Sequence, residues 1–157
     1  MIREQGPILL DSRALAWLHA EGRNGYLKLV LSRFDVYVSA LSIYELASAL
    51  LYYRLSDPVK TIRSLEKIYH IIYLDKEILA TAARIDADLT YKGVKHNNID
   101  AIVVATAIKY NMPLITTKTS IYDDFKPYGI TVVAIDKLIK ATEERLKKEI
   151  KKLSELD

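Results

Sequence analysis

The chain has 157 residues, of which 50% are apolar, and it carries a formal net charge of +3. This length and apolar fraction are typical of one globular domain and exclude a disordered chain, while the weakly basic charge permits a nucleic-acid partner without requiring one. The absence of cysteine excludes disulfides, a thiolate nucleophile and cysteine-ligated metals, which leaves oxygen and imidazole as metal ligands.

Membrane and export signals are missing from the sequence. No apolar run approaches the roughly 18 residues needed to cross a bilayer. The N-terminal segment from Met1 to Pro7 lacks the apolar core of a signal peptide. We therefore expect a cytoplasmic protein with no membrane partner.

Short apolar runs alternate with longer segments of helical period along the chain. The short runs are typical of buried strands, and the longer segments are helical by periodicity, with Pro58 suited to a first turn and Gly93 to a position past a helix end. In chain order we expect a strand at 8–11, helices at 12–20 and 26–31, a strand at 35–39, helices at 40–55 and 58–69, a strand at 70–74, helices at 76–92 and 98–110, strands at 114–117 and 130–135, and a helix at 136–157.

This alternation predicts an α/β fold. Strands that read as nearly continuous apolar runs belong to parallel sheets with both faces covered by helices. No linker or repeat divides the sequence, so we expect a single domain over residues 1–157. The C-terminal segment 136–157 is predicted to be an amphipathic helix, with Leu146, Ile150 and Leu153 on one side, packed on its own domain or against a partner.

Three carboxylates stand in apolar surroundings. Asp11 ends an apolar run, Glu45 interrupts a helical stretch, and Asp100 opens the helix predicted at 98–110. Ligands of parallel sheets gather beyond the carboxyl ends of the strands, so these acids and the Thr116 hydroxyl converge at one edge if their elements are neighbours. Two carboxylates about 5 Å apart repel by roughly 3 kcal/mol at an effective dielectric of 20. Such a cluster favours a bound proton or a divalent cation, and oxygen ligands favour Mg²⁺ or Mn²⁺.

Each acid also has a structural interpretation that the sequence leaves open. Asp11 could cap the helix that follows it. Asp100 could interact with the helix dipole behind an Asn98 cap. Glu45 could lie on an exposed seam, although its helical neighbours mix small and apolar residues.

Four passages of the chain resemble the PIN-domain family, and within it the VapC-type toxin ribonucleases. They are Ile8-Leu9-Leu10-Asp11-Ser12, Ser39-Ala40-Leu41-Ser42-Ile43-Tyr44-Glu45-Leu46, Asn98-Ile99-Asp100-Ala101-Ile102-Val103-Val104-Ala105-Thr106-Ala107 and Pro113-Leu114-Ile115-Thr116-Thr117. The resemblance implies a three-layer sandwich with a mostly parallel sheet between helices. It also implies a metal-dependent endoribonuclease that acts on RNA, forms a homodimer and binds a cognate antitoxin. Asp11, Glu45 and Asp100 would bind Mg²⁺ or Mn²⁺, with Thr116 nearby in the catalytic site.

The chain departs from the family pattern at one position. The family often places a fourth acid two residues after the threonine of its fourth strand, where this chain has Lys118. Asp123 or Asp124 could supply the missing carboxylate, or both could lie in a solvated turn. Lys118 favours an alternative function, a non-catalytic PIN relative that binds RNA or protein; a PIN nuclease of RNA maturation also stays open.

Basic residues lie near the predicted acidic edge in the sequence. They could follow the phosphate backbone of an RNA strand, although lysines are also ordinary surface residues. These residues are Arg13, Lys92, Lys95, His96 and Lys118.

Overall fold

The computed structural model describes residue 2 and residues 5–54 and 57–155. Within these residues, five strands form one sheet in the order β3-β2-β1-β4-β5, and every neighbouring pair is parallel. The strands are β1 (Pro7–Leu10), β2 (Asp35–Ser39), β3 (His70–Ile72), β4 (Leu114–Thr116) and β5 (Val132–Ala134). The predicted parallel sheet is confirmed.

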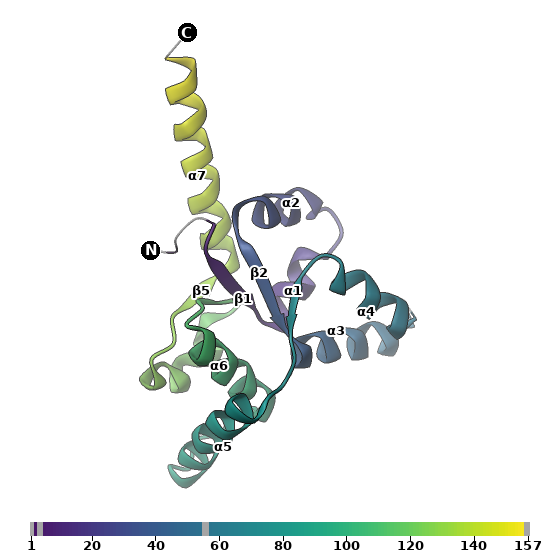
Figure 1. The fold of residues 1–157 in the computed structure, drawn as a ribbon, viewed down its shortest axis with the longest axis vertical. Coiled ribbons are helices and arrows are strands. Elements are labelled where there is room, and N and C mark those ends of the chain that lie inside the picture. Colours follow the sequence, from purple (N-terminus) through teal and green to yellow (C-terminus); the bar gives the residue numbers. More distant parts are fainter. Residues whose placement is uncertain (1, 3–4, 55–56, 156–157) are drawn as a thin grey trace.

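Helices connect the strands and cover the sheet (Figure 1). They are α1 (Ser12–Leu18), α2 (Asn24–Arg33), α3 (Ala40–Tyr52), α4 (Pro58–Glu66), α5 (Lys76–Tyr91), α6 (Asn98–Tyr110) and α7 (Ile135–Ser154), with a 3₁₀ helix η1 (Thr119–Tyr128) between β4 and β5.

The core lies on both faces of the sheet. Successive residues of a strand point to opposite faces, so Ile8 and Leu10 of β1 join a cluster with Leu15 of α1, whereas Leu9 joins another with Val104 of α6. All three β1 residues are fully buried. Helix, sheet and helix therefore form the three layers that the sequence predicts.

Several predicted details differ from the structure, among them the ends of α3 and β3, which come at Tyr52 and Ile72 and not at 55 and 74. Asn97, not Asn98, caps α6: its backbone is extended and its side-chain oxygen accepts a hydrogen bond from the Ile99 amide at 2.8 Å. The helix η1 was not predicted. Its inward residues Tyr122 and Phe125 are three apart, which matches the three residues per turn of a 3₁₀ helix. The predicted ends at 55 and at 156–157 lie outside the described residues.

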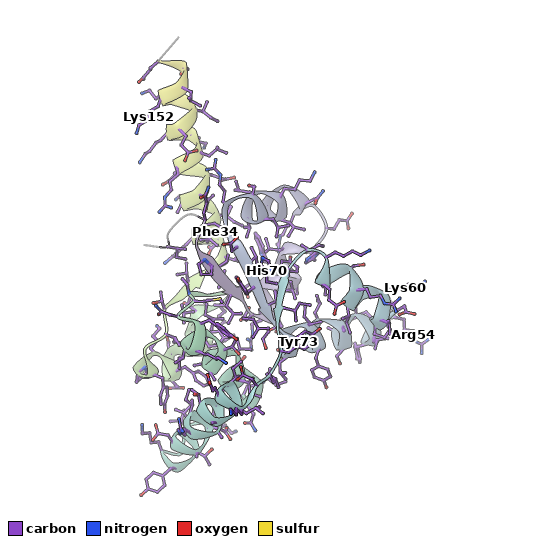
Figure 2. The ribbon with its side chains drawn as sticks, in the orientation of Figure 1. Phe34, Arg54, Lys60, His70, Tyr73 and Lys152 are labelled. Carbon is purple, nitrogen blue, oxygen red and sulfur yellow. The ribbon has the colours of Figure 1, made fainter. Side chains whose placement is uncertain are left out.

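The C-terminal helix is covered only along its first half. Ile135, Leu138 and Ile139 of α7 are buried, but Ile150 and Leu153 are 58% and 66% exposed. Figure 1 shows the end of α7 projecting beyond the rest of the molecule, and Figure 2 shows Lys152 on this projecting part. In the part of the chain that the structure describes, no helix is both long and apolar enough to span a membrane.

Candidate functional site

The predicted acidic edge lies at the centre of the sheet. Leu10 of β1 pairs with Val38 of β2 on one side and with Ile115 of β4 on the other. The residues that follow Leu10 and Ile115 are Asp11 and Thr116. After β1 the chain adds β2 and β3 on one side of β1, and later adds β4 and β5 on the other side. Ligands of such sheets bind at the carboxyl ends of the strands where the strand order reverses, which is here between β1 and β4.

Asp11 has two roles, one for each carboxylate oxygen. Its Oδ1 accepts a hydrogen bond from the Ala14 amide at 2.8 Å, which caps α1. Its Oδ2 accepts hydrogen bonds from the Tyr122 hydroxyl at 3.0 Å and from Arg13 Nη1 at 3.2 Å. The residue is 1% exposed, so these contacts fix the carboxylate. The interpretation of Asp11 as a helix cap is confirmed, and its role in a cation site stays a prediction.

Asp100 meets Asp11 through a shared arginine. Asp100 is buried in the first turn of α6, where Arg13 donates to both its oxygens, from Nη1 to Oδ1 at 3.1 Å and from Nη2 to Oδ2 at 3.2 Å. Partial burial alone would lower the pKa of Arg13, but the hydrogen bond to Asp100 and the charges of Asp100 and Asp11 outweigh it and raise that pKa. Arg13 is therefore a permanent cation between the two aspartates.

Glu45 lies beside this group as a half-buried side chain on α3. Its burial raises its pKa, a hydrogen bond with Ser12 opposes that rise, and the charge of Asp100 adds to it. The net pKa is above the usual value, chiefly because burial disfavours the charged carboxylate, with a smaller contribution from the neighbouring acids. Across 5–54 and 57–155, no three aspartate, glutamate or histidine side chains are placed to hold a metal ion as they stand.

Tyr122 is the site residue that the sequence did not reveal. It is fully buried in η1 and donates its hydroxyl hydrogen to Asp11 Oδ2. Burial, followed by the charge of Asp11, raises the pKa of Tyr122, so the hydroxyl stays a donor. The signal in the sequence was the spacing of Tyr122 and Phe125, two aromatic residues three positions apart in a segment that otherwise looks like a loop.

Thr116 and Asp123 are the other two residues predicted for the site. Thr116 is buried, and its hydroxyl oxygen accepts a hydrogen bond from the Lys118 amide at 3.4 Å. Asp123 is exposed on η1 and forms an ion pair with Lys126. Its carboxylate accepts a hydrogen bond from Lys126, and within the described ranges it joins no group of three acids placed to hold a metal ion. Its assignment as a metal ligand stays a prediction without support from its placement.

Most of the predicted basic edge is paired with acids. Lys92 binds Asp88, and the largely covered His96 side chain binds Asp86. A hydrogen bond with the Val94 carbonyl at 3.0 Å, and then the bond with Asp86, raises the pKa of His96. Lys95 and Lys118 are exposed and form no ion pair with any side chain in the described ranges. Of the five basic residues predicted near this edge, these two are the ones without an acidic partner among the described side chains.

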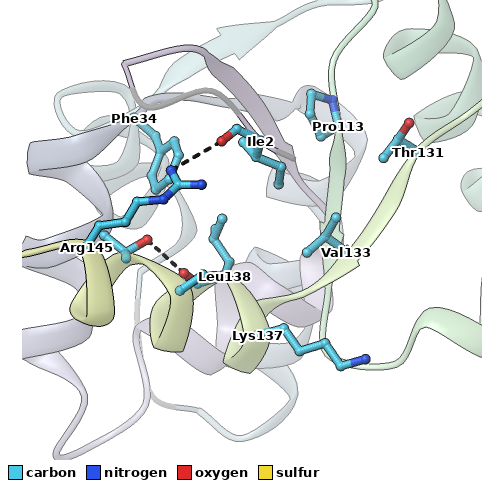
Figure 3. Close-up of a pocket in the computed structure, with 10 residues that line it drawn as sticks. Ile2, Phe34, Pro113, Thr131, Val133, Lys137, Leu138 and Arg145 are labelled. Carbon is cyan, nitrogen blue, oxygen red and sulfur yellow. Dashed lines mark hydrogen bonds between the residues drawn. The ribbon is translucent and has the colours of Figure 1, made fainter. Parts of the chain in front are cut away.

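A large pocket lies at the opposite end of the sheet. It measures about 400 Å³ and is bounded by Pro113 and Thr131, which precede β4 and β5, and by Lys137, Leu138 and Arg145 of α7 (Figure 3). Because it opens at the amino ends of the strands, it is separate from the aspartates.

A family comparison gives this geometry its context. The family model for the PIN domain matches residues 8–123. The chain belongs to the PIN-domain family. This PIN domain is 31% identical over 143 residues to a VapC ribonuclease of Pyrococcus furiosus, a match that covers 91% of this chain and 95% of the relative.

Solved structures share the fold of this PIN domain. VapBC-1 from nontypeable Haemophilus influenzae aligns with a TM-score of 0.66 and 16% identity, over 83% of this chain and 98% of that one. A toxin–antitoxin complex from Klebsiella pneumoniae aligns with a TM-score of 0.59 and 19% identity, over 82% and 97%. The resemblance to the PIN family and its three-layer fold is confirmed.

Proposed function

We propose that this PIN domain is a metal-dependent endoribonuclease that hydrolyses phosphodiester bonds of RNA and acts as the toxin of a toxin–antitoxin pair. The observation that carries the proposal is the convergence of Asp11 and Asp100, from distant parts of the sequence, on one cationic atom. The similarity to a VapC ribonuclease over nearly the whole chain supports the choice of RNA.

The donor set fits Mg²⁺ or Mn²⁺ by its chemistry. Asp11 and Asp100 supply carboxylate oxygens, which hard divalent cations prefer, and both already face one cationic nitrogen atom, Nη1 of Arg13. Glu45 is the third candidate ligand. When bound, such a metal makes a water molecule nucleophilic near neutral pH and offsets negative charge on the phosphoryl oxygens.

The protein's own groups hold this arrangement in place. The Tyr122 hydroxyl and the Ala14 amide fix Asp11, and the Ser12 hydroxyl orients Glu45. Hydrogen-bonded supports of this kind keep metal-binding carboxylates in one geometry. Lys95 and Lys118, at the same edge, are free to bind phosphates of an RNA strand.

Cleavage of a mixed-sequence single-stranded RNA, end-labelled and incubated in Mg²⁺, Mn²⁺ or EDTA, tests the proposal. We expect Asp100→Asn to lower the rate at least about a hundredfold, since even supporting groups of a metal site are worth 10–100-fold. Asp35→Asn is the matched control, because it removes the same charge from an exposed residue at the start of β2. Equal rates for wild type and Asp100→Asn, or cleavage that persists in EDTA, would refute the assignment.

A non-catalytic RNA- or protein-binding module is the second candidate. The observation that favours it is Arg13, which already neutralises both aspartates. Binding of the same RNA without cleavage in any metal would support it. Toxin and RNA-maturation roles are separated by expressing the active protein alone, since only a toxin is expected to arrest growth.

We further propose a cognate antitoxin and a homodimer in the cytoplasm, where the RNA substrate lies. The toxin–antitoxin complexes among the structural relatives support the antitoxin. The homodimer is supported by an apolar groove of about 350 Å³ whose lining includes Tyr44 and Leu51 of α3 and Tyr73 after β3, all exposed; Figure 2 shows Tyr73. Exposed apolar patches of this kind often mark protein interfaces. Light scattering over a range of protein concentrations tests the dimer.

A further inference from the structure

Arg13 occupies the side from which a cation would approach the two aspartates. Its Nη1 lies 3.2 Å from Asp11 Oδ2, 3.1 Å from Asp100 Oδ1 and 3.4 Å from the Tyr122 hydroxyl oxygen. The Ala14 amide occupies a site on Asp11 Oδ1, and the Tyr122 hydroxyl occupies the second site on Asp11 Oδ2, the oxygen that Arg13 also contacts. A metal ion that bridges Asp11 Oδ2 and Asp100 Oδ1, with ligand distances of about 2.1 Å for Mg²⁺, would therefore need the space that the guanidinium fills.

The charges lead to the same conclusion. Asp11 and Asp100 are almost completely buried, and buried carboxylates require a counter-charge or a proton. Arg13 supplies that charge in the absence of metal, with the two-pronged geometry that makes arginine–carboxylate pairs strong. A divalent ion would supply it instead, and it would repel a guanidinium held a few ångströms away. The two cations are alternatives for one pair of aspartates.

We propose that Arg13 is an internal counter-ion that competes with the divalent metal for Asp11 and Asp100, and that metal binding displaces its guanidinium towards solvent. The inference rests on the proposed function only in taking these aspartates as the metal site. It makes Arg13 a residue that sets the metal affinity.

The position of Arg13 permits this displacement. The residue lies in the first turn of α1, and its side chain is 30% exposed, so a long flexible side chain can turn outwards without disturbing the core. Asp11 cannot move in the same way, because it caps the helix and is 1% exposed. The exchange therefore moves the arginine and leaves the aspartates in place.

Isothermal titration of Mn²⁺ into the metal-free protein tests the competition without measuring catalysis. We expect Arg13→Met to bind Mn²⁺ at least about tenfold more tightly than wild type, because no bidentate ion pair has to be broken. Arg33→Met is the matched control for the lost positive charge: Arg33 pairs with Glu149, and its side chain is 25% exposed. Its affinity should equal that of wild type.

Thermal melting in EDTA and in Mn²⁺ gives a second readout and shows that the variants fold. Arg13→Met should melt at a lower temperature than wild type in EDTA, since the aspartates have lost their counter-ion. It should also gain more from Mn²⁺, because tighter binding to the folded state stabilises it further. If Arg13→Met does not fold in EDTA, Arg13→Lys is used in its place. Its Mn²⁺ affinity should be higher than that of wild type, because lysine cannot form the bidentate pair with Asp100.

The outcomes separate this inference from the proposed function. Equal or weaker Mn²⁺ binding by Arg13→Met, with binding that Asp100→Asn abolishes, overturns the competition and leaves the metal site intact. Absence of Mn²⁺ binding in both wild type and Arg13→Met overturns the metal site and the competition together. Tighter binding by Arg13→Met that Asp100→Asn abolishes, with no change in Arg33→Met, supports the competition.

Discussion

Removal of one hydroxyl group tests whether Tyr122 supports the candidate site. Tyr122→Phe deletes the group that donates to Asp11 Oδ2 at 3.0 Å and leaves the ring in its buried place. Hydrogen bonds to charged groups contribute about 1.5–3 kcal/mol, and a buried acceptor that loses its donor loses that amount. The free energy of unfolding should fall by this amount. At this chain length that loss lowers the melting temperature by roughly 3–12 °C.

The assay is equilibrium unfolding in urea, followed by circular dichroism at fixed protein concentration in EDTA. Tyr128→Phe is the matched control, because Tyr128 is in the same 3₁₀ helix and its hydroxyl also donates to an aspartate, the partly exposed Asp88. Its loss should be clearly smaller, since water can replace the hydroxyl there. Equal losses in the two variants, or a loss below about 0.5 kcal/mol in Tyr122→Phe, an ordinary surface value, would refute the assigned role.

Two further predictions concern regions away from the aspartates. The raised pKa of His96 means that its pair with Asp86 stabilises the fold fully below the unfolded-state pKa of about 6.5 and loses this effect as the pH rises through the raised value. The melting temperature of wild type should therefore exceed that of His96→Gln by more at pH 6 than at pH 9, and a difference that does not change with pH would contradict the pairing. Asn111 ends α6 with a positive φ of 49°, which costs other non-glycine residues about 1–2 kcal/mol. Asn111→Ala should lower the free energy of unfolding by about 1 kcal/mol, whereas Asn111→Gly should leave it nearly unchanged; equal losses would contradict the left-handed cap.

The sequence predicted the inner strands β1 and β2 well because most of their residues are buried or partly buried on both faces of the sheet. β2 lies at the predicted residues 35–39, and β1 differs by one residue at each end. A continuous apolar run specifies such a strand without knowledge of its neighbours. The 3₁₀ helix was missed because only Tyr122 and Phe125 of its residues are buried, and two inward positions do not establish a period.

The candidate site was predictable only in part, for a physical reason. Asp11 and Asp100 were identified because a carboxylate in apolar sequence is anomalous wherever its partner lies. Arg13 was interpreted as a phosphate-binding residue at the edge, whereas its guanidinium turns inwards to the two aspartates. An arginine that faces solvent and one that turns inwards as a counter-ion have the same local sequence, and only the position of α6 relative to α1 distinguishes them.

The order of the strands in the sheet has a consequence for synthesis of the protein. β1 is made first, yet its neighbour β4 begins only at Leu114, and the residues that surround Asp11 extend to Tyr122. A nascent chain that has been synthesised only to a point before Asp100 contains Asp11. It lacks Asp100, and it cannot yet form the pair of strands β1 and β4. Under the proposed function, such a nascent fragment cannot cleave the message from which it is translated, so the nuclease becomes active only when its own synthesis is nearly finished.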